Sequence, residues 1–227
     1  MATHSLRRDH SSFFIVAAIT IIMSILFCVR QAEAADTNAA RAFVQQNIER
    51  ANAIFGNQST SPEQRQTEFR QLLLSITDTR RIGLFVLGQY GNDATPEQLS
   101  AFQNTFTDYV IGAFESQLGK FKGGRITVTD ATMRTPNEFV VNAEMSRSIG
   151  SEPLTMAFRL GVLPNGSFVV TDMQFEGLWL ALSERLELTA FLQQHGGDIS
   201  ALTDNLRART QTQTLAGTAG GSRSAGR

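Results

Sequence analysis

Before residue 123, apolar residues recur mostly at three- and four-residue steps, which is the spacing of one helix face. The pattern predicts a first helix over residues 36–55. Ser61 and Thr95 each begin a Ser/Thr-Pro-Glu-Gln run, a typical N-terminal signal of a helix. We therefore expect a second helix from Ser61 to near Asp78, a short third helix capped by Asp78, and a long fourth helix after Thr95.

After Gly123-Gly124 the pattern changes from helical to alternating, which predicts three or four β-strands. Pro164-Asn165-Gly166 is a turn signal, so the last two strands should form a hairpin and the sheet should be antiparallel. The predicted strands lie around residues 126–128, 139–145, 154–162 and 168–175.

Helical spacing returns over residues 177–194, and a short final helix is expected over 199–209. From Thr210 the chain is mostly Thr, Gln, Gly, Ser and Ala without an apolar period, so we expect residues 210–227 to be disordered. The order of elements predicts an α+β fold, with an antiparallel sheet of about four strands packed against several helices.

The first 34 residues have the features of a secretory signal peptide. Arg7 and Arg8 precede a mostly apolar run from Phe13 to Val29, and Ala32-Glu33-Ala34 is a small-x-small cleavage pattern. An uncleaved membrane anchor is the alternative interpretation of the same run. Both interpretations predict export, and they place the folded domain at residues 35–209.

Composition excludes several classes of function. The chain has 20 Lys and Arg against 21 Asp and Glu, so its net charge of −1 gives no basic surface for nucleic acid. After residue 34 there is no Cys and a single His, His195, which excludes disulfides, thiolate catalysis and Cys/His metal sites. His195 stands before two glycines, where we expect it to end a helix.

The sequence offers no convincing catalytic group. Asp172 and Glu176 are the best carboxylate pair, but four residues of extended strand separate them by about 13 Å. That distance is too long for paired acid/base work. The rival hypothesis is a cone-shaped, steroid-isomerase-like enzyme, in which Asp172 or Tyr109 would transfer a proton; we expect no catalytic residue and no metal.

Phenylalanine dominates the bulky residues, with 16 Phe against one Trp and two Tyr. Such side chains bury a large apolar surface with few polar groups. They either pack into a solid core, as in an adaptor that binds only protein, or line a pocket for an apolar ligand. Periodicity alone does not separate these outcomes.

Several runs stand in a recognisable order: Phe69-Arg-Gln-Leu-Leu-Leu, Ile82-Gly-Leu-Phe-Val-Leu-Gly88, Ala94-Thr-Pro-Glu-Gln98, Val169-Val-Thr-Asp172 and Phe175-Glu-Gly177. In this order and spacing the chain resembles the MlaC/toluene-tolerance family of periplasmic phospholipid-binding proteins. The likeness covers roughly residues 40–209.

The resemblance implies a periplasmic, monomeric carrier without a cofactor, not an enzyme. It would shuttle phospholipid between an outer-membrane lipoprotein complex and an inner-membrane ABC transporter complex. The acyl chains would lie in an apolar cavity between a twisted sheet and helices. Gly91 and Trp179 differ from many family members, which leaves another lipid such as a hopanoid as an alternative ligand.

Candidate binding residues follow from the apolar faces and the resemblance together. Phe106, Tyr109 and Val110 on the fourth helix are expected to face Val141 and Phe158 on the sheet, together with Leu160. Arg81, Arg147 and Arg159 are head-group candidates, because a guanidinium is the usual partner of a phosphate. The expected lipid-binding residues are Phe85, Phe102, Phe106, Tyr109, Val110, Val128, Val141, Phe158, Leu160, Val170 and Trp179.

Overall fold

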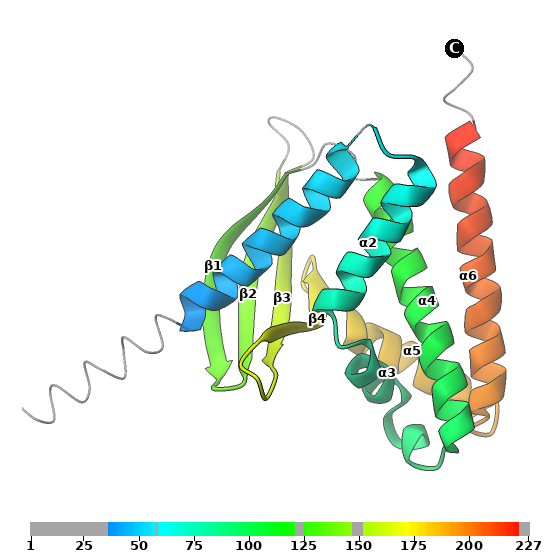
Figure 1. Cartoon of the computed structure of the whole chain (residues 1–227). Helices are drawn as coiled ribbons and strands as arrows, with labels where there is room; N and C mark the ends of the chain where they lie inside the picture. Colours follow the sequence, from blue (N-terminus) through cyan, green and yellow to red (C-terminus); the bar gives the residue numbers. More distant parts are fainter. Residues whose placement is uncertain (1–35, 58, 121–124, 147–151, 223–227) are drawn as a thin grey trace, which may run out of the picture.

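The computed structural model describes residues 36–57, 59–120, 125–146 and 152–222 (Figure 1). The predicted signal peptide lies outside these residues, and so does Arg147. Within the described part, no helix combines the length and the hydropathy that crossing a membrane requires.

The first half of the described chain is helical, as its apolar period predicts. Ser61 accepts a hydrogen bond from the Gln64 N–H, and Asp78 accepts one from the Arg81 N–H. Thr95 and Gln98 cap each other reciprocally. The predicted helix starts are therefore confirmed. The elements are an N-terminal helix over residues 36–56, α2 (Pro62–Ile76), α3 (Thr79–Leu87), the 3-10 helix η1 (Gly88–Asn92) and α4 (Pro96–Lys120).

A five-stranded antiparallel sheet follows, with the strands in sequence order. The predicted α+β class and the antiparallel sheet are confirmed; the fifth strand has two residues and was not expected. An irregularity in the β3–β4 register follows Arg159, which pairs with Asp172, whereas Leu160 already pairs with Val170. The strands are β1 (Arg125–Thr135), β2 (Glu138–Ser146), β3 (Leu154–Val162), β4 (Phe168–Phe175) and β5 (Leu178–Trp179).

The link between α2 and α3 ties the helices to the edge of the sheet. Thr77 forms a parallel bridge with Val170 of β4, and the Asp78 N–H donates to the Val170 carbonyl at 3.2 Å. Asp78 thus caps α3 and pairs with the sheet at once. This contact fixes where α3 begins relative to β4.

Two helices complete the fold, α5 (Leu180–Gln194) and α6 (Ile199–Ser222). His195 is the C-cap of α5, as predicted. The predicted end of the last helix at Arg209 is wrong, because the backbone of α6 stays helical to Ser222. Extending a helix is much easier than nucleating one, so the packed turns around Leu202 and Leu206 can propagate into a polar segment that would not form a helix alone.

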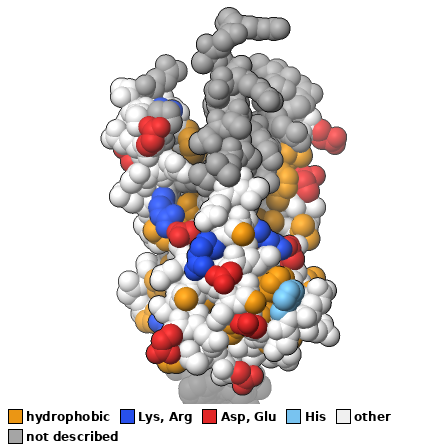
Figure 2. Space-filling view, turned by 90° about the vertical axis from the view of Figure 1, so that its right-hand side faces the viewer, with side chains coloured by type: hydrophobic (Ala, Val, Ile, Leu, Met, Phe, Trp, Pro, Cys, Tyr) orange, Lys and Arg blue, Asp and Glu red, His pale blue; other side chains and the backbone are white. Residues whose placement is uncertain are grey.

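The helices form two separate layers of packing. The N-terminal helix crosses one face of the sheet, while α4 and α6 run side by side at the other end of the molecule, with α3 and α5 between them and the sheet (Figure 1). The N-terminal helix and the strands share one apolar cluster, and helices α3 to α6 share another. On the side of the molecule seen in Figure 2, basic and acidic side chains are mixed, as the balanced composition predicts.

Candidate functional site

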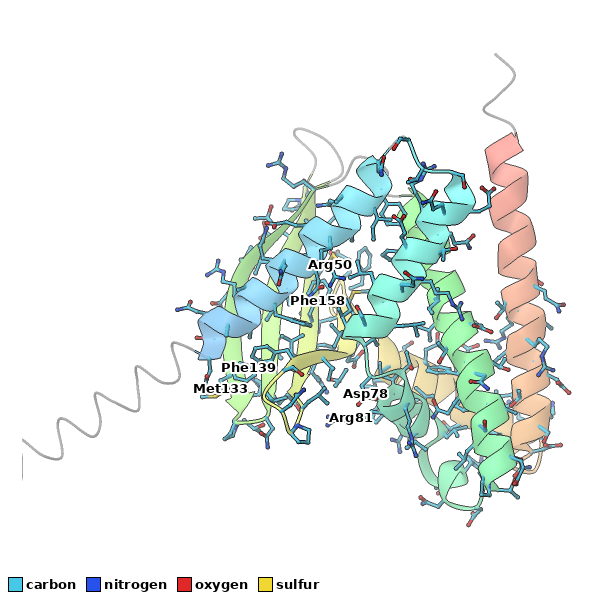
Figure 3. The ribbon with its side chains drawn as sticks, in the orientation of Figure 1. Arg50, Asp78, Arg81, Met133, Phe139 and Phe158 are labelled. Carbon is cyan, nitrogen blue, oxygen red and sulfur yellow. The ribbon has the colours of Figure 1, made fainter. Side chains whose placement is uncertain are left out.

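One face of the sheet carries a continuous apolar surface under the N-terminal helix. Val128, Val141 and Leu160 are buried there, with Ala40 and Val44 of the helix packed on them. Phe158 and Val170 are half-buried against the same cluster. Figure 3 shows Phe139, Met133 and Phe158 at the strands beneath this helix. The structure therefore brings together five of the predicted lining residues on this face of the sheet.

The same face continues into a second cluster, which we call the methionine patch. Its centre is Met145 and Met156, with Met173, Phe158 and Phe175 around them. Phe158 belongs to both clusters, so the two are continuous. Among the described residues, every member of the methionine patch is on a strand; the side chains of α4 beyond residue 113 are not among those described.

Methionine suits a surface that must adapt to its contacts. Its unbranched, polarisable side chain fits irregular apolar shapes at little cost. Met145 and Met156 lie within the predicted strands 139–145 and 154–162 but are not among the predicted lipid-binding residues. Their alternation with polar positions along two adjacent strands is the signal that points to them.

The predicted residues of α4 lie elsewhere. Phe102, Phe106 and Tyr109 are buried in the helical cluster, where Leu202 and Leu206 of α6 pack against them. Val110 packs at the margin of the same cluster. The expectation that these α4 residues face Val141, Phe158 and Leu160 is therefore wrong. An apolar stripe predicts that a helix face is buried, but it does not say which element buries it.

Phe85 and Trp179 each contact an arginine and belong to neither apolar cluster. Phe85 is 41% exposed, and the Arg185 guanidinium lies 4.8 Å from its ring centroid. Trp179 is half-buried in β5, with the Arg159 guanidinium 4.4 Å from its ring. The structure thus separates both aromatics from the sheet face that holds the other lining candidates.

Arg159 lies between Trp179 and Asp172 on the opposite face of the sheet from Phe158. Successive strand residues alternate between faces, so Arg159 points away from the apolar surface that Phe158 and Leu160 share. It pairs in register with Asp172, and its buried Nε has no hydrogen-bond partner within the described part of the molecule. Burial raises the pKa of Asp172, and the nearby Arg159 charge acts against that rise.

Asp172 itself serves a structural purpose. Its Oδ1 accepts hydrogen bonds from the Met173 N–H at 2.8 Å and from the Ala181 N–H at 2.9 Å. Ala181 is in the first turn of α5, whose N-cap residue Trp179 makes no side-chain cap bond. Asp172 therefore caps α5 from a neighbouring strand.

Arg81, the second head-group candidate, is exposed in the first turn of α3. Its guanidinium lies against β3, because the Arg81 Nη1 is 3.1 Å from the position that a Cβ atom at Gly161 would occupy. Gly161 shares its strand face with Arg159, two residues away. Arg81 and Arg159 thus approach the same face of β3, opposite the apolar clusters, and Figure 3 shows Arg81 beside Asp78.

A small polar cluster lies within the helical layer. The Tyr109 hydroxyl donates to the Glu184 carboxylate at 3.3 Å, and Arg209 pairs with Glu187. Burial raises the pKa of Glu184, and the Glu187 charge adds to the rise. Burial also raises the pKa of Tyr109. Groups of three or more His, Cys, Asp or Glu suited to a metal do not occur among the residues described.

Comparison with known proteins identifies this arrangement. The family model described as MlaC protein matches residues 41–208. The chain belongs to the MlaC family. No curated protein matches the chain.

Among solved structures, the phospholipid-binding protein from Ralstonia solanacearum, in complex with a phospholipid, has a TM-score of 0.67 to this chain. The two are 22% identical, and the match covers 77% of this chain and 98% of that one. At this identity the likeness concerns the fold. It confirms the MlaC-type arrangement of helices around a five-stranded antiparallel sheet.

Proposed function

We propose that this MlaC-family protein is a periplasmic carrier that holds the acyl chains of a phospholipid against the apolar face of its sheet. The observation that carries the proposal is the methionine patch, an apolar strand surface continuous with the cluster under the N-terminal helix. Family membership and a fold shared with a phospholipid-bound protein support the same ligand class.

The energetics of the ligand explain why such a surface is needed. Each methylene transferred out of water is stabilised by about 0.8 kcal/mol, so two chains of roughly 15 methylenes resist exposure by about 24 kcal/mol. A carrier must therefore cover the chains almost completely. Flexible methionine side chains allow chains of different length and unsaturation to be covered by one surface.

The proposal includes an arginine that binds the phosphate of the lipid head group. Arg81 is the stronger candidate, because it is exposed, whereas Arg159 is held between Trp179 and Asp172. Both arginines approach the face of β3 opposite the apolar clusters. The head group of a lipid bound on the apolar face would therefore extend around the edge of the sheet to bring its phosphate to them. Arg147 lies outside the described residues.

Partners and location belong to the same proposal. The predicted leader would export the chain to the periplasm as a monomer. There it would exchange lipid with an inner-membrane ABC transporter complex and an outer-membrane lipoprotein complex, as the family resemblance implies. Family membership also favours a binding protein over an enzyme.

Lipid extraction followed by mass spectrometry tests the proposal. Protein comprising residues 35–227, purified without detergent, should yield about one diacyl lipid per chain, the content of one enclosed site. A hopanoid in the extract would select the alternative ligand. Protein that holds no lipid and takes up none from labelled vesicles would contradict carriage.

A substitution locates the site. Phe158→Asp places a charge on the apolar face and should abolish loading, because an unpaired carboxylate is strongly disfavoured there. The milder Met173→Gln keeps the side-chain length and should reduce bound lipid. Thr132→Asp, at an exposed position of β1, is the matched control and should leave loading unchanged. Equal loading in all three would place the lipid elsewhere.

A further inference from the structure

Large apolar side chains are exposed mainly around α3 and α5. Leu84 and Phe85 on α3 are each 41% exposed, and Leu178, Leu182 and Leu186 are 56%, 48% and 66% exposed. Leu182 and Leu186 are four residues apart and therefore lie on one side of α5. Leu178 is in β5, where it pairs with Phe175 on the apolar face of the sheet. We call Leu84, Phe85, Leu182 and Leu186, with the arginines described next, the α3–α5 face.

The two helices contribute to one surface because a contact joins them. The Arg185 guanidinium lies over the Phe85 ring, and its Nη1 donates to the Phe85 carbonyl at 3.0 Å. Leu182 is three residues before Arg185, on the same side of α5. Leu186 follows Arg185 directly, and α3 and α5 are packed against each other.

The charge on this face is basic. Arg80 and Arg81 are exposed on α3, one helical turn before Leu84 and Phe85. α3 itself contains no acidic residue. On α5, Glu184 bonds to Tyr109 in the helical cluster, and the charge of Glu187 is compensated by its ion pair with Arg209. Arginines beside exposed Leu and Phe are typical of helices that lie at the surface of an anionic bilayer.

We propose that the α3–α5 face docks the protein on an anionic lipid surface, with the exposed leucines and Phe85 entering the interface and the arginines meeting lipid phosphates. A second copy of this chain fits less well, because a two-fold contact would bring arginines against arginines. The inference goes beyond lipid carriage, since a chain holding no lipid would present the same face.

Vesicle flotation tests this with protein comprising residues 35–227, which holds every described helix and strand. The protein should bind phosphatidylglycerol-rich vesicles at least about tenfold more strongly than pure phosphatidylcholine vesicles. Raising NaCl from about 50 mM to about 500 mM should weaken the binding, because salt screens exposed charge. Equal binding to both vesicle types, or none to either, would overturn the inference.

Matched variants locate the surface. Leu182→Ser with Leu186→Ser should lower the vesicle partition coefficient more than about tenfold, and Arg80→Gln about fivefold. Leu74→Ser on α2, where the leucine is 42% exposed, and Arg134→Gln on β1 should bind as wild type does. If the double variant fails to fold by circular dichroism, the Arg80→Gln comparison still decides.

Two further readouts separate the alternatives. Loss as large in Leu74→Ser as in the double variant would overturn the α3–α5 face as the docking site. A dimer seen by sedimentation that the double variant dissociates, without vesicle binding, would make the face a contact between copies and overturn it too. Lipid content by mass spectrometry is measured in parallel, so failure of carriage and failure of docking are seen independently.

Discussion

Truncation of Phe106 has different expected effects on stability and lipid binding if the residue is part of a packed core and if it lines a lipid pocket. It is 1% exposed, its ring stacks on Phe102 at 5.4 Å, and α6 residues surround it. Phe106→Ala leaves a cavity in a packed cluster and should lower the free energy of unfolding by about 3–5 kcal/mol. Urea unfolding of delipidated protein measures this loss, and the lipid bound per folded chain should not change.

Phe85→Ala is the matched comparison. Phe85 is largely exposed beneath Arg185, so its truncation should cost less than about 1 kcal/mol. If Phe106→Ala were equally mild and lost its lipid, the helical cluster would be the binding site after all. The placement of the acyl chains on the sheet face would then be wrong.

Glu184 is the residue at which pH should act on stability. Burial first, and the Glu187 charge second, raise its pKa in the folded state. Such a carboxyl contributes its full stability below the unfolded pKa, near 4.3, and that contribution is lost as pH rises through the folded pKa. Glu184→Gln removes the titration, so its free energy of unfolding relative to wild type should increase from about pH 4 to pH 7.

Glu187→Gln is the control for that titration. Glu187 pairs with Arg209, so its removal breaks an ion pair rather than relieving a buried charge. The substitution also removes the like charge that adds to the rise of the Glu184 pKa, so the variant should gain less stability relative to wild type with rising pH than Glu184→Gln does. If both variants showed the same pH trend, the effect would come from net charge and not from the burial of Glu184.

At the scale of elements, α5 depends on a cap that comes from another element. Asp172 bonds to the Ala181 N–H and lies opposite Arg159 in the sheet. Asp172→Ala removes the cap and leaves Arg159 without its carboxylate, so it should cost about 2 kcal/mol or more. Ser61→Ala removes only a local cap of α2 and should cost about 0.5–1 kcal/mol. Thermal unfolding of the two variants compares these losses.

The elements themselves can be predicted from the sequence because their signals are local. Ser61, Asp78 and Thr95 mark helix starts through bonds to residues three positions away. The cap on α5 spans nine residues and crosses a turn, and no local pattern contains it. Composition alone does not predict the extension of α6 past Arg209, because that extension depends on the packed turns that precede it.

The candidate site is harder to predict because it depends on which faces meet. Alternation correctly placed Val128, Val141 and Leu160 on one buried strand face. The helical period correctly predicted that Phe106 is buried, but only the fold shows that α6 rather than the sheet buries it. The predicted lining favours large aromatic side chains and therefore leaves out Met145 and Met156 of the methionine patch.

At the scale of the whole molecule, the helical cluster and the apolar face of the sheet differ in how completely their side chains are buried. The helical cluster of α3 to α6 is a packed core of buried residues. The sheet face carries the half-buried positions, including Phe158, Met173 and Phe175, that a ligand can cover. In the proposed carrier, the helical layer, with α5 held on Asp172, supports the sheet while lipid binds on the other face.

This difference predicts which parts of the protein lose stability when the lipid is removed. A ligand that binds only the folded state stabilises it, so delipidated protein should melt at a lower temperature than loaded protein. Amide hydrogen exchange should rise on delipidation in β2 and β3 around Met145 and Met156. Bound lipid raises the free energy needed to open those strands, and the delipidated protein lacks this contribution. Exchange in α4 around Phe106 should rise much less, since that helix is closed by α6 in either state. Equal changes in both regions would mean that the lipid lies between the two clusters, and a change confined to α4 would move the binding site to the helical layer.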